Sequence, residues 1–228
     1  MEQAEFFWKN YLHEYRDTKL PVDLNFKRDG TSDGSHLLKL KISKGTSKRI
    51  LKYCHDNGVT EFNLFITLFI IFLSKVSSES EIIIGTPIAN RIEENFWETV
   101  GYFANTIPLR FKVNNKSSFR ELCSIFRENY LECMDNAFVP FDKLIDKIGV
   151  KRIFNTNPVF QALFSFKEAS TLRKDYVLSE SRIVSDDVGD MSLIFDAIKK
   201  ETNFEINLRF NSKLFLLDTA NRFLDHFG

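Results

Sequence analysis

The residues best suited to chemistry in this chain gather around a polar loop between two apolar segments. Residues 81–85 form a short, continuous apolar run that leads through Pro87 to Arg91. Arg91 offers five fixed N–H donors, which suit it to holding several backbone carbonyls or a carboxylate. Asn105 stands where the chain enters the next apolar run, and its amide can both donate and accept hydrogen bonds. Two interpretations stay open: these polar side chains hold a long loop in shape, or they line a substrate channel.

Other reactive side chains do not form a recognisable catalytic or metal site. Cys54, His55 and Asp56 are consecutive, and neighbours on a helix point about 100° apart, so we do not expect them to act together. The other histidines have no second ligand at the spacing of a zinc site. The phosphate-cradling glycine motifs are absent, so nucleotide binding has no support. The sequence therefore predicts no catalytic residue and no metal site.

The composition indicates a globular protein with an apolar interior rich in phenylalanine. Of the 228 residues, 43% are hydrophobic and 27% charged, with 24 Phe against 6 Tyr and 2 Trp. So many rings without hydroxyl groups need a deep core or a wide apolar interface. The 31 basic residues balance the 31 acidic ones, which argues against nucleic acid or an anionic membrane as a partner. Three cysteines without a Cys-x-x-Cys pair favour a reducing, cytoplasmic location.

Helices and strands must alternate to position the polar loop. Apolar residues at helical spacing predict helices over residues 5–14, 46–57, 62–76, 119–137, 140–149 and 216–227. Alternating or continuous apolar runs predict strands over residues 38–42, 81–85, 105–113, 159–166, 191–198 and 204–210. The run at 62–76 is too short to span a bilayer, which needs roughly 20 residues. The mixture predicts a single α/β sandwich domain over residues 1–228, with a sheet covered by helices.

Local signals predict where several elements begin and end. Gly85 permits unusual dihedrals and Pro87 removes a ladder donor, so we expect the strand to end there. Ser118 followed by Glu121 predicts a capping box. Pro140 is expected in the first turn of its helix. The mostly polar residues 167–190 are expected to be irregular, and residues 25–35 to form a linker.

Six short motifs follow one another along the chain. The first two are Phe-Trp-Lys-Asn-Tyr-Leu at residues 7–12 and Gly-Val-Thr at 58–60. Ile-Gly-Thr-Pro-Ile-Ala-Asn-Arg at 84–91 precedes Val-Gly-Tyr-Phe-Ala-Asn-Thr-Ile-Pro-Leu-Arg at 100–110. Pro-Phe-Asp and Asn-Pro-Val-Phe-Gln then occupy residues 140–142 and 157–161. In this order they resemble the C-terminal lobe of the condensation domains of nonribosomal peptide synthetases, which join two carrier-bound acyl groups through an amide bond.

This resemblance implies one lobe of a chloramphenicol-acetyltransferase-like pair. In the family the two lobes form a V around a tunnel, which the phosphopantetheine arms of donor and acceptor carrier proteins enter. The N-terminal lobe carries the catalytic histidine in His-His-x-x-x-Asp-Gly, a motif absent from these 228 residues. The resemblance therefore implies a chain that is inactive alone and binds no cofactor directly. Its expected partners are an N-terminal condensation lobe, carrier proteins and adjacent synthetase domains.

The resemblance also assigns expected roles to individual residues. A loop over residues 87–103 is expected to form the floor of the tunnel. The side chains expected to line the tunnel are Pro87, Arg91, Tyr102, Asn105 and Thr106. The residues expected to maintain the motifs are Gly85, Gly101, Arg110, Pro140, Phe141, Arg152, Asn157 and Pro158. A latch that crosses to the other lobe is expected within residues 167–190.

The chain also departs from the family pattern. Residues 136–138 read Asn-Ala-Phe in place of His-Gln-Asp, and Ile153 replaces an aspartate. These departures leave open how the parent lobe handles its acceptor side. Two other hypotheses remain: a lobe that docks carriers or partners without chemistry, and half of a coenzyme A-dependent acyltransferase. The Asn-Thr pair at residues 105–106 argues against the related epimerisation domains.

Overall fold

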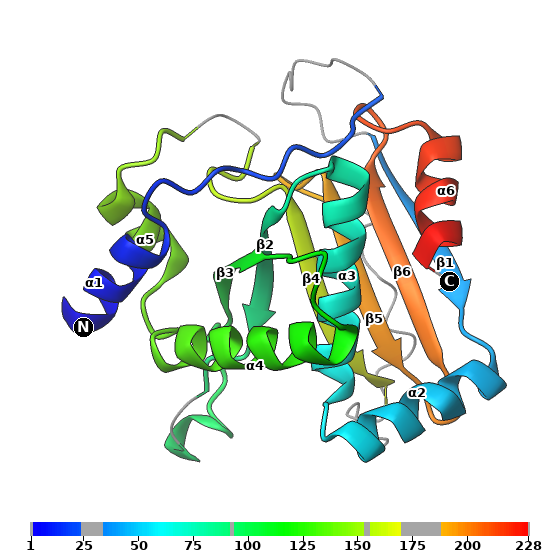
Figure 1. Ribbon diagram of the computed structural model, residues 1–228. Helices are drawn as coiled ribbons and strands as arrows, with labels where there is room; N and C mark the ends of the chain where they lie inside the picture. The colour runs from blue at the N-terminus through cyan, green and yellow to red at the C-terminus, as the bar shows by residue number, and fades with distance from the viewer. Residues whose placement is uncertain (1, 24–33, 92–93, 153–155, 170–187, 228) are drawn as a thin grey trace.

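A six-stranded mixed sheet forms the centre of the computed structural model, which describes residues 2–23, 34–91, 94–152, 156–169 and 188–227 (Figure 1). Its strands are β1 (Ser35–Lys41), β2 (Glu81–Ile88), β3 (Asn105–Lys112), β4 (Ala162–Glu168), β5 (Leu193–Lys199) and β6 (Phe204–Asn211). They lie in the order β1-β6-β5-β4-β2-β3. The pairs β2–β4 and β4–β5 are parallel and the others antiparallel. The predicted α/β architecture with a mixed sheet is confirmed.

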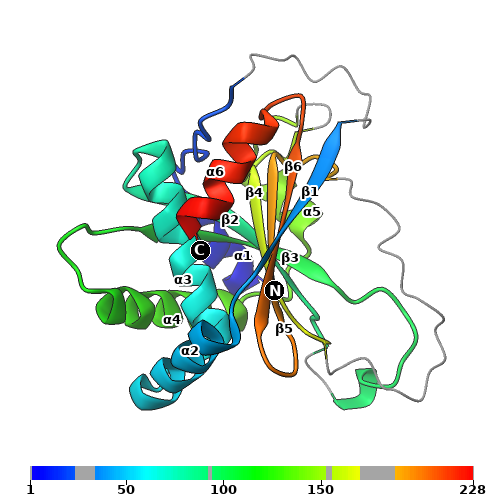
Figure 2. The same ribbon diagram turned by 90° about the vertical axis from the view of Figure 1, so that its right-hand side faces the viewer.

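Helices gather mainly on one side of this sheet. Figure 2 shows α2 (Lys44–Asn57), α3 (Glu61–Ser77), α4 (Phe119–Asp135) and α6 (Leu217–Phe227) on the same side. The helices α1 (Glu2–Tyr11) and α5 (Phe141–Ile148) lie near β3, at the end of the strand order. A short 3-10 helix, η1 (Glu94–Phe96), belongs to the long connection between β2 and β3. The predicted helices are all present, with ends shifted by a few residues.

The helix α3 is the centre of the core because it is apolar on almost every side. Its Phe69 ring stacks on Phe195 of β5, with 4.7 Å between centroids, and lies 5.8 Å from Phe164 of β4. Phe72 meets Phe223 of α6 edge-on at 5.5 Å. The many phenylalanines are therefore used to join helices to the sheet. Within the ranges given above, no single helix is long and apolar enough to cross a membrane; α2 and α3 pass that test only together, bent by 106°.

The strand β2 continues past the end predicted from Gly85 and Pro87. It pairs with β3 through Ile88, opposite Asn105, so the chain stays extended beyond the proline. Gly85 does not have a positive φ. Its small size matters for packing instead, because a Cβ built there would lie 2.2 Å from the ring of Phe160. The prediction that these residues end the strand was wrong: Pro87 can stay in the strand because β2 pairs with β4 only at Gly85.

Two other boundaries also differ from the predictions. The strand β4 begins at Ala162 rather than at Val159, because the Asn157 Oδ1 accepts the N–H groups of Val159 and Phe160 at 3.0 and 3.1 Å and holds them in a turn. Pro140 precedes α5 as its N-cap instead of lying in the first turn. Most of the expected linker and of the expected latch falls outside the described residues.

Candidate functional site

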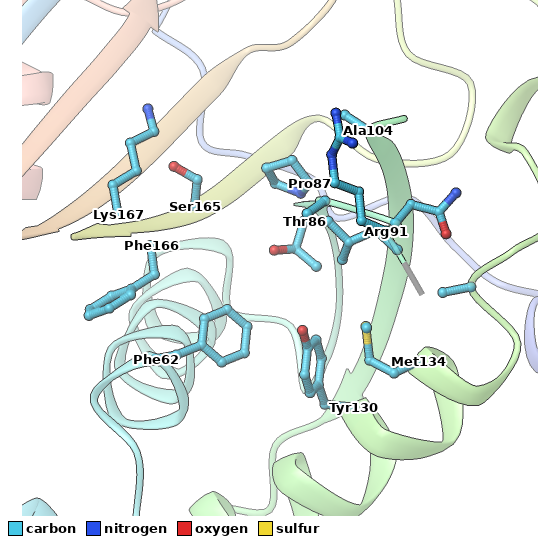
Figure 3. Close-up of a pocket in the computed structure, with 14 residues that line it drawn as sticks. Phe62, Thr86, Pro87, Arg91, Ala104, Tyr130, Met134, Ser165, Phe166 and Lys167 are labelled. Atoms are coloured by element: carbon cyan, nitrogen blue, oxygen red, sulfur yellow. The ribbon is translucent and has the colours of Figure 1, made fainter. Parts of the chain in front are cut away.

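A cavity of about 670 Å³ opens where β2 and β4 separate (Figure 3). These parallel strands pair at a single position, Gly85 opposite Leu163. Beyond it, residues from both strands line the cavity, among them Pro87 of β2 and Ser165 of β4. Crevices outside the carboxyl ends of parallel strands are where open α/β sheets bind ligands. This cavity is therefore the candidate functional site.

The floor of the cavity is apolar and comes from two helices. Figure 3 shows Phe62 of α3 beside Tyr130 and Met134 of α4, below the strands. The rings of Phe62 and Tyr130 have centroids 4.9 Å apart. Burial, together with the charge of Cys133, raises the pKa of the Tyr130 phenol, which therefore stays neutral at physiological pH. The floor suits a hydrocarbon or aromatic group.

Arg91 lines the cavity and also shapes the loop that follows β2. Its Nη1 donates to the carbonyls of Phe96 and Thr99, the second at 2.8 Å. The Nε1 of Trp97 donates to the Arg91 carbonyl at 3.2 Å, and the guanidinium carbon lies 4.3 Å from the centroid of the Phe103 ring. Arg91 therefore holds the loop in shape and also lines the cavity, and its role in a substrate channel stays a prediction.

Asn105 joins the sheet to the connection between α4 and α5. Its Nδ2 donates to the carbonyls of Ala137 and Val139 at 2.8 and 2.9 Å. Its Oδ1 accepts from the N–H groups of Thr106 and Phe141 at 3.0 and 3.1 Å. Because Ala137 lines the cavity, Asn105 acts on the cavity through this connection. Its own side chain is not part of the lining.

Arg110 fastens α1 to the sheet. Its side chain pairs with the Glu81 carboxylate and donates from Nη1 to the carbonyls of Tyr11 and His13, at 3.1 and 2.9 Å. The hydroxyl of Tyr11 accepts from the Arg110 backbone N–H at 2.7 Å. Arg110 therefore connects α1 to the sheet and does not line the cavity.

A second cavity of about 410 Å³ collects several of the other predicted residues. Thr106, expected in the tunnel, lies here and not in the main cavity. The residues expected to maintain motifs that also line it are Phe141, Arg152, Asn157 and Pro158. Arg152 donates to Asp146 at 3.0 Å, and the Pro158 carbonyl accepts the Tyr15 hydroxyl at 2.8 Å.

The loop beyond Arg91 carries apolar side chains into solvent. Tyr102 is 94% exposed and Val100 fully exposed, and Trp97 is 62% exposed. Tyr102 and its neighbour Gly101 line neither cavity. Exposed apolar residues gathered on one loop are typical of an interaction surface. We refer to residues 94–103 as the aromatic loop.

Sequence reasoning missed a buried carboxylate beside the cavity. Asp196 of β5 is 3% exposed, and it accepts hydrogen bonds from Ser165, from Lys167 at 3.0 Å and from Arg209 at 2.7 Å. Burial alone would raise the pKa of Asp196, but the Ser165 hydrogen bond and the two cations lower it overall, so the carboxyl stays ionised. A single acid inside the apolar run 191–198 was the signal available.

The consecutive Cys54, His55 and Asp56 do not form a reactive group. The thiol of Cys54 is buried, and burial together with the charge of Glu61 raises its pKa to about 11. His55 is exposed, and the Asp56 carboxylate pairs with Lys52 at 2.8 Å. In the part of the chain that the structure describes, no three His, Cys, Asp or Glu side chains are grouped to hold a metal ion.

Asn136 and Ala137, which depart from the family pattern, contribute backbone carbonyls to contacts within the fold. The carbonyl of Asn136 accepts the indole N–H of Trp8 at 2.8 Å, and that of Ala137 accepts from Asn105. These contacts do not depend on the side chains that differ from the family pattern. Ile153, the other departure, lies outside the described residues.

A mixed sheet with helices mainly on one side, and a cavity between its separating parallel strands, defines the class of fold. The condensation domain family matches residues 1–228, so the chain belongs to that family. It is 28% identical over 233 residues to bacitracin synthase 1 of Bacillus licheniformis, a match to 100% of this chain and 4% of that protein. It is 26% identical over 232 residues to gramicidin S synthase 2 of Brevibacillus brevis, covering 100% of this chain and 5% of that protein.

Solved structures confirm the fold. The X-domain from teicoplanin biosynthesis superposes with a TM-score of 0.87 at 20% identity, over 99% of this chain and 52% of that one. The chain thus spans about half the length of this structural neighbour and less than a tenth of the two synthases named above.

Proposed function

We propose that the chain is the C-terminal lobe of a condensation domain that forms amide bonds between carrier-bound acyl and aminoacyl thioesters. The observation that carries this proposal is the family match over residues 1–228, together with relatives that are peptide synthetases. The chain's coverage of 52% of a structural neighbour supports a lobe rather than a whole domain. The single domain over residues 1–228 is part of the same proposal.

The chemistry needs a base from outside the described residues. The acceptor amine attacks the thioester carbonyl of the donor, a C–N bond forms, and the C–S bond breaks. A base takes the amine proton and returns it to the leaving thiolate. By resemblance, the base is the histidine of a partner lobe. In the main cavity the only titratable side chains among the described lining residues are those of Arg91, Tyr130 and Lys167, so this lobe is assigned to substrate positioning.

The aromatic loop supports a partner lobe as the neighbour of this surface. Trp97, Val100 and Tyr102 expose apolar groups, and Arg91 holds the loop in one shape through its hydrogen bonds. A preformed apolar surface loses little conformational freedom when it binds. We assign it to the N-terminal condensation lobe. The carrier proteins, adjacent synthetase domains, substrates presented on phosphopantetheine arms and a cytoplasmic location belong to the same proposal.

The test is amide formation by a two-lobe protein, in which an N-terminal condensation lobe carrying His-His-x-x-x-Asp-Gly precedes residue 1. Aminoacyl groups are supplied on holo carrier proteins, and the product on the acceptor carrier is measured by mass spectrometry. We expect product from carrier-bound donors only. Equal transfer from free acyl-coenzyme A would instead favour an acyltransferase. Binding of both carriers without transfer, when the histidine is present, would favour a docking lobe.

A further inference from the structure

We propose that the main cavity selects an acyl group whose apolar body ends in a carboxylate, and that Lys167 recognises this carboxylate. The inference rests on the proposed function, because that function makes the ligand an acyl group and its anion a carboxylate. It goes further in naming the class of acyl group and the residue that distinguishes it. We call the side of the cavity at Arg91 and Lys167 its mouth. The positive charges of these two residues, the hydrogen bonds that hold them and the apolar floor opposite them all point to such a group.

Both charged residues among the described lining of the cavity are cations. They are Arg91, from the end of β2, and Lys167, from β4. The described lining includes no carboxylate. A mouth with two positive groups and no negative one favours an anion and repels an ammonium group.

The two cations stand apart from the apolar floor. Figure 3 shows the charged ends of Arg91 and Lys167 pointing away from Phe62, Tyr130 and Met134. An acyl chain could therefore lie against the rings with its charged end at the mouth, where the charge keeps contact with water. A group that is apolar at one end and anionic at the other matches both regions.

The carboxylate of Asp196 holds Lys167 in place and still leaves a net positive charge beside the cavity. It accepts from Lys167 through Oδ1 at 3.0 Å and from Arg209 through Oδ2 at 2.7 Å, so one negative charge meets two positive ones. The Asp196 side chain is only 5% exposed, whereas that of Lys167 is 57% exposed. An ammonium group has three N–H donors, and the contact with Asp196 leaves others free for a ligand carboxylate.

The two remaining contacts of Asp196 make Lys167 replaceable in an experiment. Ser165 and Arg209 still bind the carboxylate when the lysine is lost. Arg91, in contrast, shapes the aromatic loop, and its replacement would change more than the charge. Lys167 is therefore the residue whose substitution isolates recognition of the anion.

The experiment is calorimetric titration of the full chain with three probes of equal length: octanoate, octanol and octylammonium. We expect octanoate to bind at least about tenfold more tightly than the other two, since among the three probes only octanoate can accept a hydrogen bond from Lys167 between two opposite charges. Lys167→Met should remove that preference, Lys167→Arg should keep it, and Lys167→Glu should turn it toward octylammonium. The exposed Lys48 of α2 supplies the matched control, and Lys48→Met should behave as the wild type.

Several results would overturn the inference. Equal affinity for the three probes in the wild type would do so, as would a preference for octanoate that survives Lys167→Met in a protein whose thermal unfolding is unchanged. The probes are free acids, alcohols and amines that need neither carrier proteins nor a second lobe. If the three probes bind equally while the two-lobe protein still forms the amide, only the acyl preference is removed. A clear preference without amide formation would remove the proposed function, and with it the assignment of the ligand as an acyl group on a carrier, but not the recognition of a carboxylate by Lys167.

Discussion

Single side chains connect parts of this molecule that lie far apart in the sequence. Asn105 bonds two carbonyls in the connection between α4 and α5 and two N–H groups, one of Thr106 in β3 and one of Phe141 at the start of α5. Tyr11 and Arg110, 99 residues apart, share hydrogen bonds that hold α1. Asp196 of β5 binds residues of β4 and β6. Buried polar groups of this kind are costly to disturb, because each partner lost leaves an unsatisfied atom.

Gly85→Ala should reduce the free energy of unfolding by about 2 kcal/mol, because the added Cβ meets the Phe160 ring and overpacks a close contact. Urea denaturation of the full chain measures the change. Gly45→Ala is the control: its nearest heavy atom would be the Ser43 Oγ, 3.8 Å away, and alanine in α2 should be neutral or slightly stabilising. Equal stability of Gly85→Ala and wild type would show that the ring moves aside freely.

Asp196→Asn should reduce the free energy of unfolding by about 3–5 kcal/mol at pH 7, since it removes the charge that compensates Lys167 and Arg209. The pKa of Asp196 is lowered from its ordinary value of 3.8, so the folded state binds fewer protons there than the unfolded state. Its contribution is present above about pH 4 and is lost as pH falls further. The gap between wild type and variant, measured by denaturation at several pH values, should therefore shrink below pH 4. A difference in the free energy of unfolding that stays constant as the pH falls would contradict the lowered pKa of Asp196.

At the scale of elements, the cavity exists because two parallel strands separate. Helices and strands could be predicted because their signals are local: Ser118 forms its capping box with Glu121, and β6 alternates apolar and polar residues. The cavity could not be predicted, since it depends on β2 and β4 pairing at one position only. Lys167 could be recognised as a candidate for binding an anion only from the structure, in which three strands bring Ser165, Asp196 and Arg209 together.

Arg91→Ala should loosen the aromatic loop without unfolding the sheet. The substitution removes two hydrogen bonds to loop carbonyls and the contact with the Phe103 ring, so the loop should open locally more often. We expect proteolytic cleavage within residues 94–103 to be about tenfold faster. Arg49→Ala, at an exposed position of α2, should leave cleavage unchanged. Equal cleavage in both variants would show that the loop keeps its shape by other contacts.

At the scale of the whole molecule, the aromatic loop is the surface that we assign to a partner lobe. Val100→Asp should leave the stability of the chain unchanged, because Val100 is fully exposed. It should weaken binding to an N-terminal condensation lobe by about tenfold or more, since a charge would be buried at the interface. Leu216, which is 52% exposed and precedes α6 near the β1 end of the sheet, supplies the control variant Leu216→Asp. Calorimetric titration of the two lobes distinguishes these outcomes.

The measurement that tests the central claim most directly compares amide formation by this chain alone with amide formation by the same chain joined to a histidine-bearing lobe. Both reactions contain the same aminoacyl-loaded carrier proteins. We predict a product only in the joined protein, and its loss when both histidines of that motif are replaced by alanine. Equal product from the chain alone would contradict the claim that this lobe supplies positioning and its partner supplies the base.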